Sequence, residues 1–468
     1  MPHRYRVLVI VSVATFVASL DLFIVNIAFP SIQRDFAGTT DATLSWVLSG
    51  YAIVTAALLV PAGRIADLLG RKRLFVAGLV TFVFASALCA AAPGAGWLIA
   101  ARVLQAAGGA ILMPASLALV LAEFPPKQRA LAVAVWSATG AIAAAAGPPI
   151  GALLVQASWR WVFLVNLPVG LVTVVLAARV LSESRDPEAR RVPDLLSAGL
   201  TVFASSALML AIVQGQSWGW TSVRIVGLLA SSVVLTAAFL YRSTRHASPV
   251  LELGLFRSRA FSAANVASIL FFAAFGAMLL SSVLFLTRVW HEDIVRAGLQ
   301  ISPGPITAAV FAVPGSILAG RFGQRVIAAV GALLFACGGA WWLTHVGLQP
   351  HYATDFLPGM LAGGAGVGFG FVIPTLASAV AGSLPPARFA TGSAVYGMTR
   401  QFGIALGVAV LIAVLSGADK SGALASFRNG WEVMMAAAIA SAIAAVTIGR
   451  IRSEPVRATA IPELELAG

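Results

Sequence analysis

The sequence of 468 residues is too apolar for a water-soluble protein: residues of the AVILMFWYC set make up 59% of it and charged residues only 10%. A soluble domain carries about 25% charged residues because most of its surface faces water, a requirement that a lipid bilayer removes. The formal net charge of +13 is spread over many short loops, which favours orientation in a membrane over a nucleic-acid-binding patch. Cys89 and Cys337 both lie in apolar stretches, so we predict no disulfide framework and no metal site.

Fourteen apolar stretches are long enough to cross a bilayer as helices, which takes about 20 residues each. We expect them at 7–30, 45–64, 74–93, 97–121, 131–155, 161–181, 195–214, 224–241, 261–287, 297–319, 326–346, 355–381, 390–416 and 431–450. The first stretch continues past Asp21 to Pro30 without a cleavage signal, so we interpret it as a retained helix. The chain is therefore predicted to be an all-α integral membrane protein.

Lysine and arginine are distributed unequally between the two sides of this predicted topology. With the N-terminus inside, the cytoplasmic segments contain 22 of them and the outer loops seven. Because positively charged loops stay on the cytoplasmic side, both termini are expected to be cytoplasmic. Arginine greatly outnumbers lysine, which suggests a GC-rich bacterial genome, so we expect a multi-pass protein of the bacterial cytoplasmic (inner) membrane.

A short repeat divides the chain. The loop after the second stretch reads GRIADLLGRKR and the loop after the tenth reads SILAGRFGQR, so that Gly70 aligns with Gly323. An offset of eight spans indicates six helices, two extra helices and six more, and duplicated halves are common among transporters. We expect an N-terminal six-helix bundle at 1–183, two extra linker helices at 184–259, a C-terminal six-helix bundle at 260–452 and a cytoplasmic tail at 453–468.

The first of these loops resembles the signature loop between the second and third helices of the major facilitator superfamily. Gly63 and Gly70 allow close approach and a tight turn, and Asp67 can lie at the positive N-terminal end of a facing helix. Arg71 belongs to the basic cluster that stays at the cytoplasmic headgroups. The resemblance implies a major facilitator fold in which Gly63, Asp67, Gly70 and Arg71 take part in conformational gating.

Further motifs resemble those of the fourteen-helix drug:proton antiporters (EmrB/QacA-type multidrug efflux transporters). They are Leu20-Asp21 with Val25-Asn26 and Pro30; Arg102-x-x-Gln105; Gly140 with Gly147-Pro148 and Gly151; SWRWVFLVNLPVG at 158–170; and Thr399-Arg400-Gln401-Phe402-Gly403. The resemblance implies that Gly147, Pro148 and Gly151 contribute to conformational gating. It also implies a substrate cavity that includes Asn26, Gln105, Arg400 and Gln401.

Asp21 is the only one of the eighteen acidic residues that this topology places well inside a span; Glu123 and Asp355 lie at span ends, and the others lie in loops or tails. A carboxylate at membrane depth costs at least ~2.5–3.5 kcal/mol, so it should face a wet cavity or a partner. Arg102 lies about five residues inside its span, deep enough for its side chain to reach Asp21. We expect the two to couple transport to protons, the alternatives being a fixed ion pair and an arginine that extends towards the headgroups.

Arg400 lies near the middle of its predicted span, too deep to reach the headgroups easily, and no acidic residue in that half of the chain lies at the same depth. It could bind backbone carbonyls, face a watery cavity or reach a partner in the other half. A structural role and a functional role both remain open for this residue.

These features are best explained by a transporter that works by alternating access. The three lysines are preceded by Arg71, Pro126 and Asp419 instead of the glycine of a P-loop, so we predict no ATP-binding site. We expect proton-coupled efflux of small lipophilic or cationic drugs by a protein that is monomeric, contacts membrane lipids and binds no cofactor. The alternatives are an exporter of an endogenous metabolite, lipid or siderophore, an uptake symporter, and a membrane-embedded enzyme. The enzyme is disfavoured because no second acidic residue or histidine pair lies at membrane depth.

Overall fold

The computed structural model describes residues 2–185, 194–246, 249–363, 366–384, 389–416 and 422–449. Within these ranges, fourteen helical segments are long and apolar enough to cross a membrane, which confirms the number predicted from the sequence. The expected tail at 453–468 lies outside the described residues.

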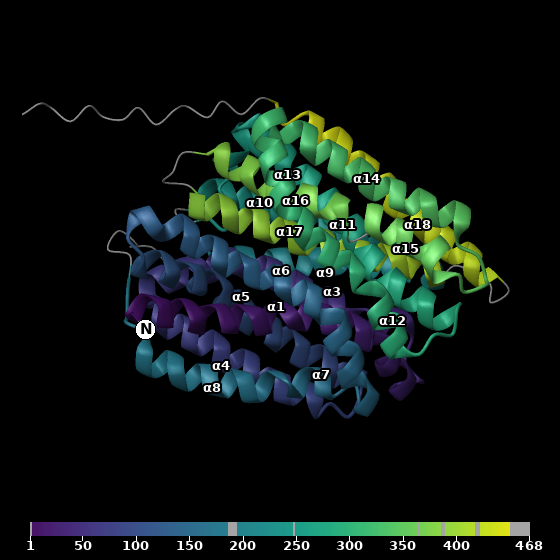
Figure 1. The fold of residues 1–468 in the computed structure, drawn as a ribbon, viewed down its shortest axis with the longest axis horizontal. Coiled ribbons are helices and arrows are strands. Elements are labelled where there is room, and N and C mark those ends of the chain that lie inside the picture. Colours follow the sequence, from purple (N-terminus) through teal and green to yellow (C-terminus); the bar gives the residue numbers. More distant parts are fainter. Residues whose placement is uncertain are drawn as a thin grey trace, which may run out of the picture.

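The N-terminal helices form one half of the molecule (Figure 1). They are α1 (His3–Asp35), α2 (Asp41–Leu44), α3 (Trp46–Leu69), α4 (Arg71–Ala90), α5 (Ala95–Glu123), α6 (Pro126–Ala157), α7 (Trp161–Leu164) and α8 (Asn166–Val180). Helix α1 packs against α6, α5 and α8, and α5 also packs against α3 and α4. This arrangement places α1 and α5 next to each other inside the half.

The C-terminal helices form the other half (Figure 1). They are α11 (Arg259–Arg288), α12 (Ile294–Ile301), α13 (Pro303–Phe322), α14 (Gln324–His345), α15 (Leu357–Ala362), α16 (Val367–Gly382), α17 (Phe389–Ser416) and α18 (Ala423–Val446), with short turns at η1 (Leu253–Arg257) and η2 (Tyr352–Phe356). Helix α17 packs against α11, α16 and α18 of its own half and against α3 of the other half. It therefore lies at the seam between the halves.

Two further helices, α9 (Leu195–Trp218) and α10 (Val223–Arg245), connect the halves. Helix α9 packs against both α3 and α17, whereas α10 packs mainly against α9. Asp194 caps α9: its carboxylate accepts hydrogen bonds from the backbone N–H and the hydroxyl of Ser197 and from Arg242 on α10. The exact boundaries of the three expected domains remain a prediction.

The repeated loops have the same backbone geometry. Gly70, between α3 and α4, has φ 122° and ψ 129°, and Gly323, between α13 and α14, has φ 91° and ψ 146°. Each glycine donates its backbone N–H to an alanine carbonyl four residues earlier, Ala66 and Ala319. A positive φ is costly for residues with a side chain, so both turns depend on glycine.

Several helix boundaries differ from the predicted ones. The predicted spans 161–181 and 297–319 each consist of two helical pieces, α7 with α8 and α12 with α13. The second pair meets where Pro303 has no N–H to continue the helix. Helix α18 begins at Ala423 and not near 431. Glu432, expected in a loop or tail, therefore lies well inside α18, where its side chain is exposed. The prediction that Asp21 is the only acidic residue well inside a span was therefore wrong. The first turns of α18 are polar, so the hydropathy pattern placed the start of this span too late.

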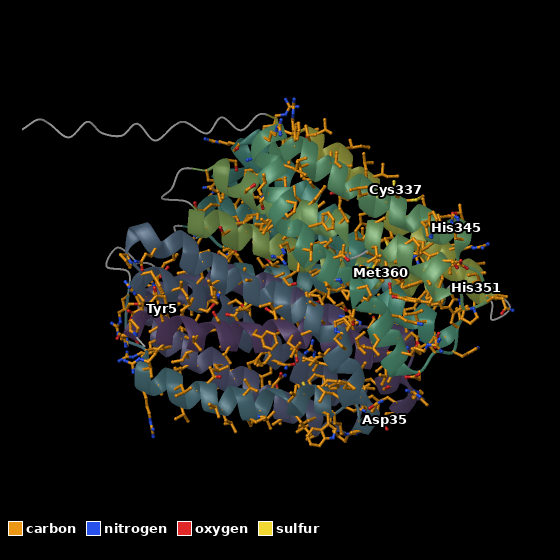
Figure 2. The ribbon with its side chains drawn as sticks, viewed as in Figure 1. Tyr5, Asp35, Cys337, His345, His351 and Met360 are labelled. Carbon is orange, nitrogen blue, oxygen red and sulfur yellow. The ribbon has the colours of Figure 1, made fainter. Side chains whose placement is uncertain are left out.

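The two ends of the helices are well separated. Figure 2 shows Tyr5, near the start of α1, and Asp35, at its end, on opposite sides of the molecule, with His345 and His351 on the side of Asp35. His345 ends α14 and His351 directly precedes η2, so neither lies at membrane depth.

Candidate functional site

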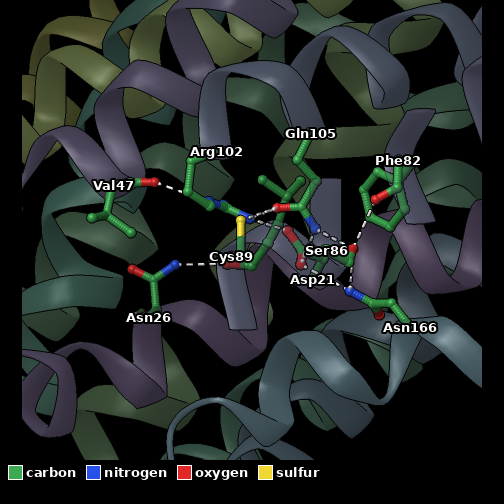
Figure 3. Close-up of polar contacts among 10 residues, drawn as sticks. Asp21, Asn26, Val47, Phe82, Ser86, Cys89, Arg102, Gln105 and Asn166 are labelled. Carbon is green, nitrogen blue, oxygen red and sulfur yellow. Dashed lines mark hydrogen bonds and ion pairs between the residues drawn. The ribbon is translucent and has the colours of Figure 1, made fainter. Parts of the chain in front are cut away.

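Asp21 and Arg102 lie side by side in the N-terminal half (Figure 3). Nη1 of Arg102 donates to Oδ2 of Asp21, and the exposed fractions of the two side chains are 1% and 0%. The ion pair joins the middle of α1 to α5 across a sequence separation of 81 residues. The sequence placed these two residues at compatible depths, and the structure brings them together.

Three uncharged side chains complete the environment of the carboxylate. Oδ1 of Asp21 accepts from Nε2 of Gln105 at 2.9 Å and from Nδ2 of Asn166 at 3.2 Å. The same two amide groups donate to Oγ of Ser86 at 2.8 and 3.3 Å. Gln105 also accepts from Arg102 at 2.6 Å, so it touches both charges. All five side chains are buried, so the two charges are compensated by each other and by these polar groups.

Arg102 is held from several sides. Its Nε donates to the backbone carbonyl of Val47 at 3.1 Å, and its guanidinium carbon lies 4.2 Å from the ring centre of Tyr51 and 5.7 Å from that of Phe163. A side chain that extended towards the headgroups would be exposed. The alternative of a snorkelling arginine is therefore wrong for this conformation.

Asn26 does not join this network. Its amide donates to the carbonyl of Leu22 on its own helix at 2.7 Å, one turn away from Asp21 (Figure 3). Gln105, the other N-terminal residue expected in the substrate cavity, is fully occupied by Asp21, Arg102 and Ser86. The assignment of both residues to a substrate cavity remains a prediction.

The signature loop is closed by a residue that the sequence motif did not reveal. Asp67 pairs with Arg71 one turn later, with 2.8 Å between Oδ1 and Nη2. The carboxylate of Glu183 accepts the backbone N–H groups of Lys72 and Arg73 at the start of α4. A Cβ atom on Gly70 would lie 2.6 Å from this carboxylate, so the glycine makes room for the cap.

Gly147 and Gly151 of α6 lie against α1. A Cβ atom on Gly147 would overlap with Cβ of Phe23, and one on Gly151 would lie 3.1 Å from Cα of Ile24. On another side of α6, the carbonyl of Pro148 would lie 2.8 Å from a Cβ atom on Gly298 of α12, in the other half. The motif thus lies where three helices meet, which agrees with the close approach expected from its small residues.

Arg400 and Gln401 lie on α17, far in sequence from this network. The guanidinium carbon of Arg400 lies 4.8 Å from the ring centre of Phe272 and 5.7 Å from that of Tyr396. Gln401 is half-buried beside it. Within the described residues, Arg400 has no ion pair and no hydrogen bond, and its Nε is buried without a partner.

Asn166, Ser86 and Glu183 are the site residues that sequence reasoning missed. Asn166 stands in the stretch SWRWVFLVNLPVG, which carries part of the family resemblance. A search for uncharged amides inside apolar stretches would have found it, because such groups need a partner in a bilayer. Among the described residues, no three His, Cys, Asp or Glu side chains lie close enough to hold a metal ion.

Comparison with known proteins gives this arrangement its context. The sequence pattern of the Major Facilitator Superfamily matches residues 11–408, most of the chain. The chain belongs to the major facilitator superfamily. Members of this superfamily are transporters of small molecules and not enzymes, so the membrane-embedded enzyme is excluded.

The relatives narrow the family further. The chain is 32% identical over 439 residues to a probable actinorhodin transporter of Streptomyces coelicolor, an alignment that covers 92% of this chain and 75% of that protein. It is 34% identical over 414 residues to the multidrug resistance protein Stp of Mycobacterium tuberculosis, covering 87% and 75%. This major facilitator protein is therefore related to the fourteen-helix drug:proton antiporters, as the motifs predicted.

The fold agrees with that of solved transporters. The crystal structure of a D-xylose–proton symporter superimposes with a TM-score of 0.66 at 14% identity, covering 96% of this chain and 98% of that one. At this identity the similarity establishes the fold alone. The chain is thus a multi-pass membrane protein with the all-helical major facilitator fold.

Proposed function

We propose that this transporter exports small lipophilic compounds in exchange for protons, with Asp21 as the group that binds the proton. The observation that carries the proposal is the buried contact of Asp21 with Arg102, Gln105 and Asn166. Burying a carboxylate at membrane depth costs free energy, and such groups typically mark ion pathways.

The network supports a two-state cycle. With Asp21 ionised, its contacts with Arg102 on α5 and with Asn166 on α8 hold three helices together. A proton on Asp21 removes the negative charge, so Arg102 loses the partner that offsets its burial, and a state that hydrates the arginine becomes favoured. Because Asp21 is inaccessible in this conformation, a proton binds it in a transiently populated open state, which protonation then stabilises. This alternation of protonation and access is the requirement for coupling two flows.

The proton gradient is large enough for the task. One charge that moves down 100 mV releases about 2.3 kcal/mol, which supports a substrate gradient of roughly fiftyfold. The gating motif of α6, Gly147 to Gly151, touches α1 next to this site and α12 of the other half. A shift of α1 on protonation would therefore displace α6 and change its contact with α12 at the interface between the halves.

A second candidate is a dedicated exporter of one endogenous metabolite, lipid or siderophore. The relative in Streptomyces coelicolor favours it, because its name refers to a single compound, actinorhodin. The name of the Mycobacterium tuberculosis relative refers to multidrug resistance and favours the broad exporter. Efflux from a pump-deficient bacterial host, measured with a panel of dyes and antiseptics, separates the two: a broad exporter protects against several and a dedicated one against none.

The location of the protein is part of the same proposal. We place it as a monomer in the bacterial inner membrane with both termini in the cytoplasm, on the basis of the positive charge of the expected inner loops. A reporter fused after Gly468 that is active only in the periplasm would overturn this orientation.

The proposed coupling is tested with purified protein in proteoliposomes. An imposed pH gradient should drive uphill transport of a compound exported by the parent protein, and Asp21→Asn should abolish this while exchange of the compound down its own gradient continues. Asparagine keeps nearly the shape of the side chain but cannot release a proton. Undiminished uphill transport by Asp21→Asn would refute the assignment and direct attention to Glu123 and Asp355.

A further inference from the structure

Arg400 on α17 is a cation within the membrane-spanning part of the chain for which the described residues offer no anion. It makes no ion pair and no hydrogen bond there, and its Nε is buried without an acceptor. The buried Arg102, by contrast, is neutralised by Asp21 and bonded through two of its nitrogens. Contacts with aromatic rings offset only part of the cost of burying a cation, so Arg400 is a group in need of a partner.

Arg400 lies on a helix that is surrounded by other helices. Helix α17 packs against α3, α9, α11, α16 and α18, which surround it. Arg400 is nevertheless half-buried and not fully buried, whereas the neighbouring Phe272, Tyr396 and Thr399 are buried. Gly397, three residues earlier on α17, faces the other half, because a Cβ atom there would lie 2.6 Å from Leu59 of α3. Arg400, one turn later on the same face of α17, therefore lies near the seam between the halves.

Several aromatic rings lie close to Arg400. Besides Phe272 and Tyr396, Phe369 on α16 lies 6.3 Å from Phe272 and 4.2 Å from Phe275, measured between ring centres. Rings beside a cation suit a flat apolar molecule that carries a negative group, because the rings stack on its body and the guanidinium binds its charge. A cationic molecule would instead be repelled by Arg400.

We infer that Arg400 binds the anionic group of the transported compound, so that the substrates are aromatic or lipophilic acids, such as carboxylates and phenolates. This inference rests on the proposed transport function and specifies its substrate class. It departs from the expectation of cationic drugs for a physical reason: the carboxylate of Asp21, which could have attracted a cation, is already occupied by Arg102, Gln105 and Asn166.

The test compares three probes of one shape and different charge. Binding of naphthoate, naphthamide and naphthylmethylammonium to the purified full-length protein in lipid nanodiscs is measured by titration calorimetry without a pH gradient. A charge-assisted contact should make naphthoate bind at least about tenfold more tightly than the neutral naphthamide, and the ammonium probe should bind most weakly. Equal affinities, tighter binding of the ammonium probe, or no binding of naphthoate would each overturn the inference.

Variants assign the preference to one residue. Arg400→Gln should remove the advantage of naphthoate over naphthamide, and Arg400→Lys should restore part of it, because lysine keeps the charge but not the planar fork. Arg224→Gln is the matched control, since Arg224 also lies over an aromatic ring, that of Trp218, but on the exposed α10. A naphthoate preference that survives Arg400→Gln, or that Arg224→Gln removes equally, would overturn the assignment.

The two proposals can fail separately. Equilibrium binding involves no gradient, so the charge preference is measured whether or not transport is coupled to protons. Loss of the preference with intact proton-driven transport refutes the substrate class alone. A preference that depends on Arg400, together with transport that ignores the pH gradient, refutes proton coupling alone.

Discussion

Gln105 touches both members of the buried ion pair: its Nε2 donates to Asp21 and its Oε1 accepts from Arg102. The carboxylate and the guanidinium are therefore bonded to each other and to the same amide. In such a closed arrangement, the loss of either charge leaves the other without compensation in a place that water does not reach in this conformation.

The first prediction concerns the cost of that imbalance. Arg102→Gln should destabilise the protein by about 3–5 kcal/mol, because the ionised Asp21 would remain buried alone. The double variant Asp21→Asn/Arg102→Gln should recover most of this loss, since it buries no charge at all. Thermal unfolding in detergent measures both, with Asp21→Asn completing the double-mutant cycle.

Additive losses in that cycle would mean that the two side chains stabilise the protein independently. They would contradict the coupled pair. The double variant should also lack proton-driven transport even where its stability is recovered, which separates the structural contribution of the pair from its proposed role in coupling.

A second prediction compares two glycines of the same motif on α6. Gly147→Ala should cost about 1–3 kcal/mol and impair transport, because its methyl group would overlap with Phe23 and push α1 away from α6. Gly140 has no atom within 4 Å of its would-be Cβ, so Gly140→Ala should be neutral or stabilising by up to about 1 kcal/mol. Unfolding temperature and substrate efflux of both variants check this, and equal effects would contradict it.

Much of the fold was predictable because the bilayer imposes simple rules. Length and apolarity were sufficient for the fourteen spans, and depth along two helices was sufficient to suggest that Asp21 and Arg102 meet. Helix ends were less predictable: the polar first turns of α18 shifted its start and misplaced Glu432. Asn166 was missed for another reason. An uncharged amide adds little to a hydropathy pattern, and only the folded structure shows that it points at a carboxylate.

The third prediction concerns pH and the junction of α9 and α10. Burial raises the pKa of Asp194, but hydrogen bonds from Ser197 and the contact with Arg242 outweigh it and hold the pKa below the usual value of 3.8. A lowered folded pKa means that the contact stabilises the protein above that value and is lost as the pH falls through the folded pKa. Between about pH 7 and about pH 3, the unfolding temperature of the parent protein should therefore fall more than that of Asp194→Asn.

The matched control for this experiment is Ser197→Ala, which removes the hydroxyl that donates to Asp194 at 2.6 Å but leaves the ion pair with Arg242. It should show an intermediate dependence on pH. An identical fall in unfolding temperature for the parent protein and Asp194→Asn would show that this carboxylate contributes nothing to acid sensitivity.

The last prediction concerns two ion pairs that join the halves at opposite ends of the helices. Arg288 at the end of α11 pairs with Asp41 at 2.8 Å, and Arg64 on α3 pairs with Glu252, just before η1, at 2.6 Å. Ion pairs that are partly accessible to solvent contribute about 0–1 kcal/mol each, enough to change the ratio of two conformations by up to about fivefold. Arg288→Gln should therefore favour opening at the end that carries Asp41, and Arg64→Gln should favour opening at the other end.

Distances between spin labels on the two halves, measured in a background in which the exposed Cys337 is replaced by serine, report both populations. The charge-swapped variant Arg288→Asp/Asp41→Arg should return the distances towards those of the parent protein, because it restores the attraction. Shifts in the same direction for both single variants would contradict the prediction. The two pairs close opposite ends of the molecule, so losing one pair should favour the conformation that losing the other disfavours.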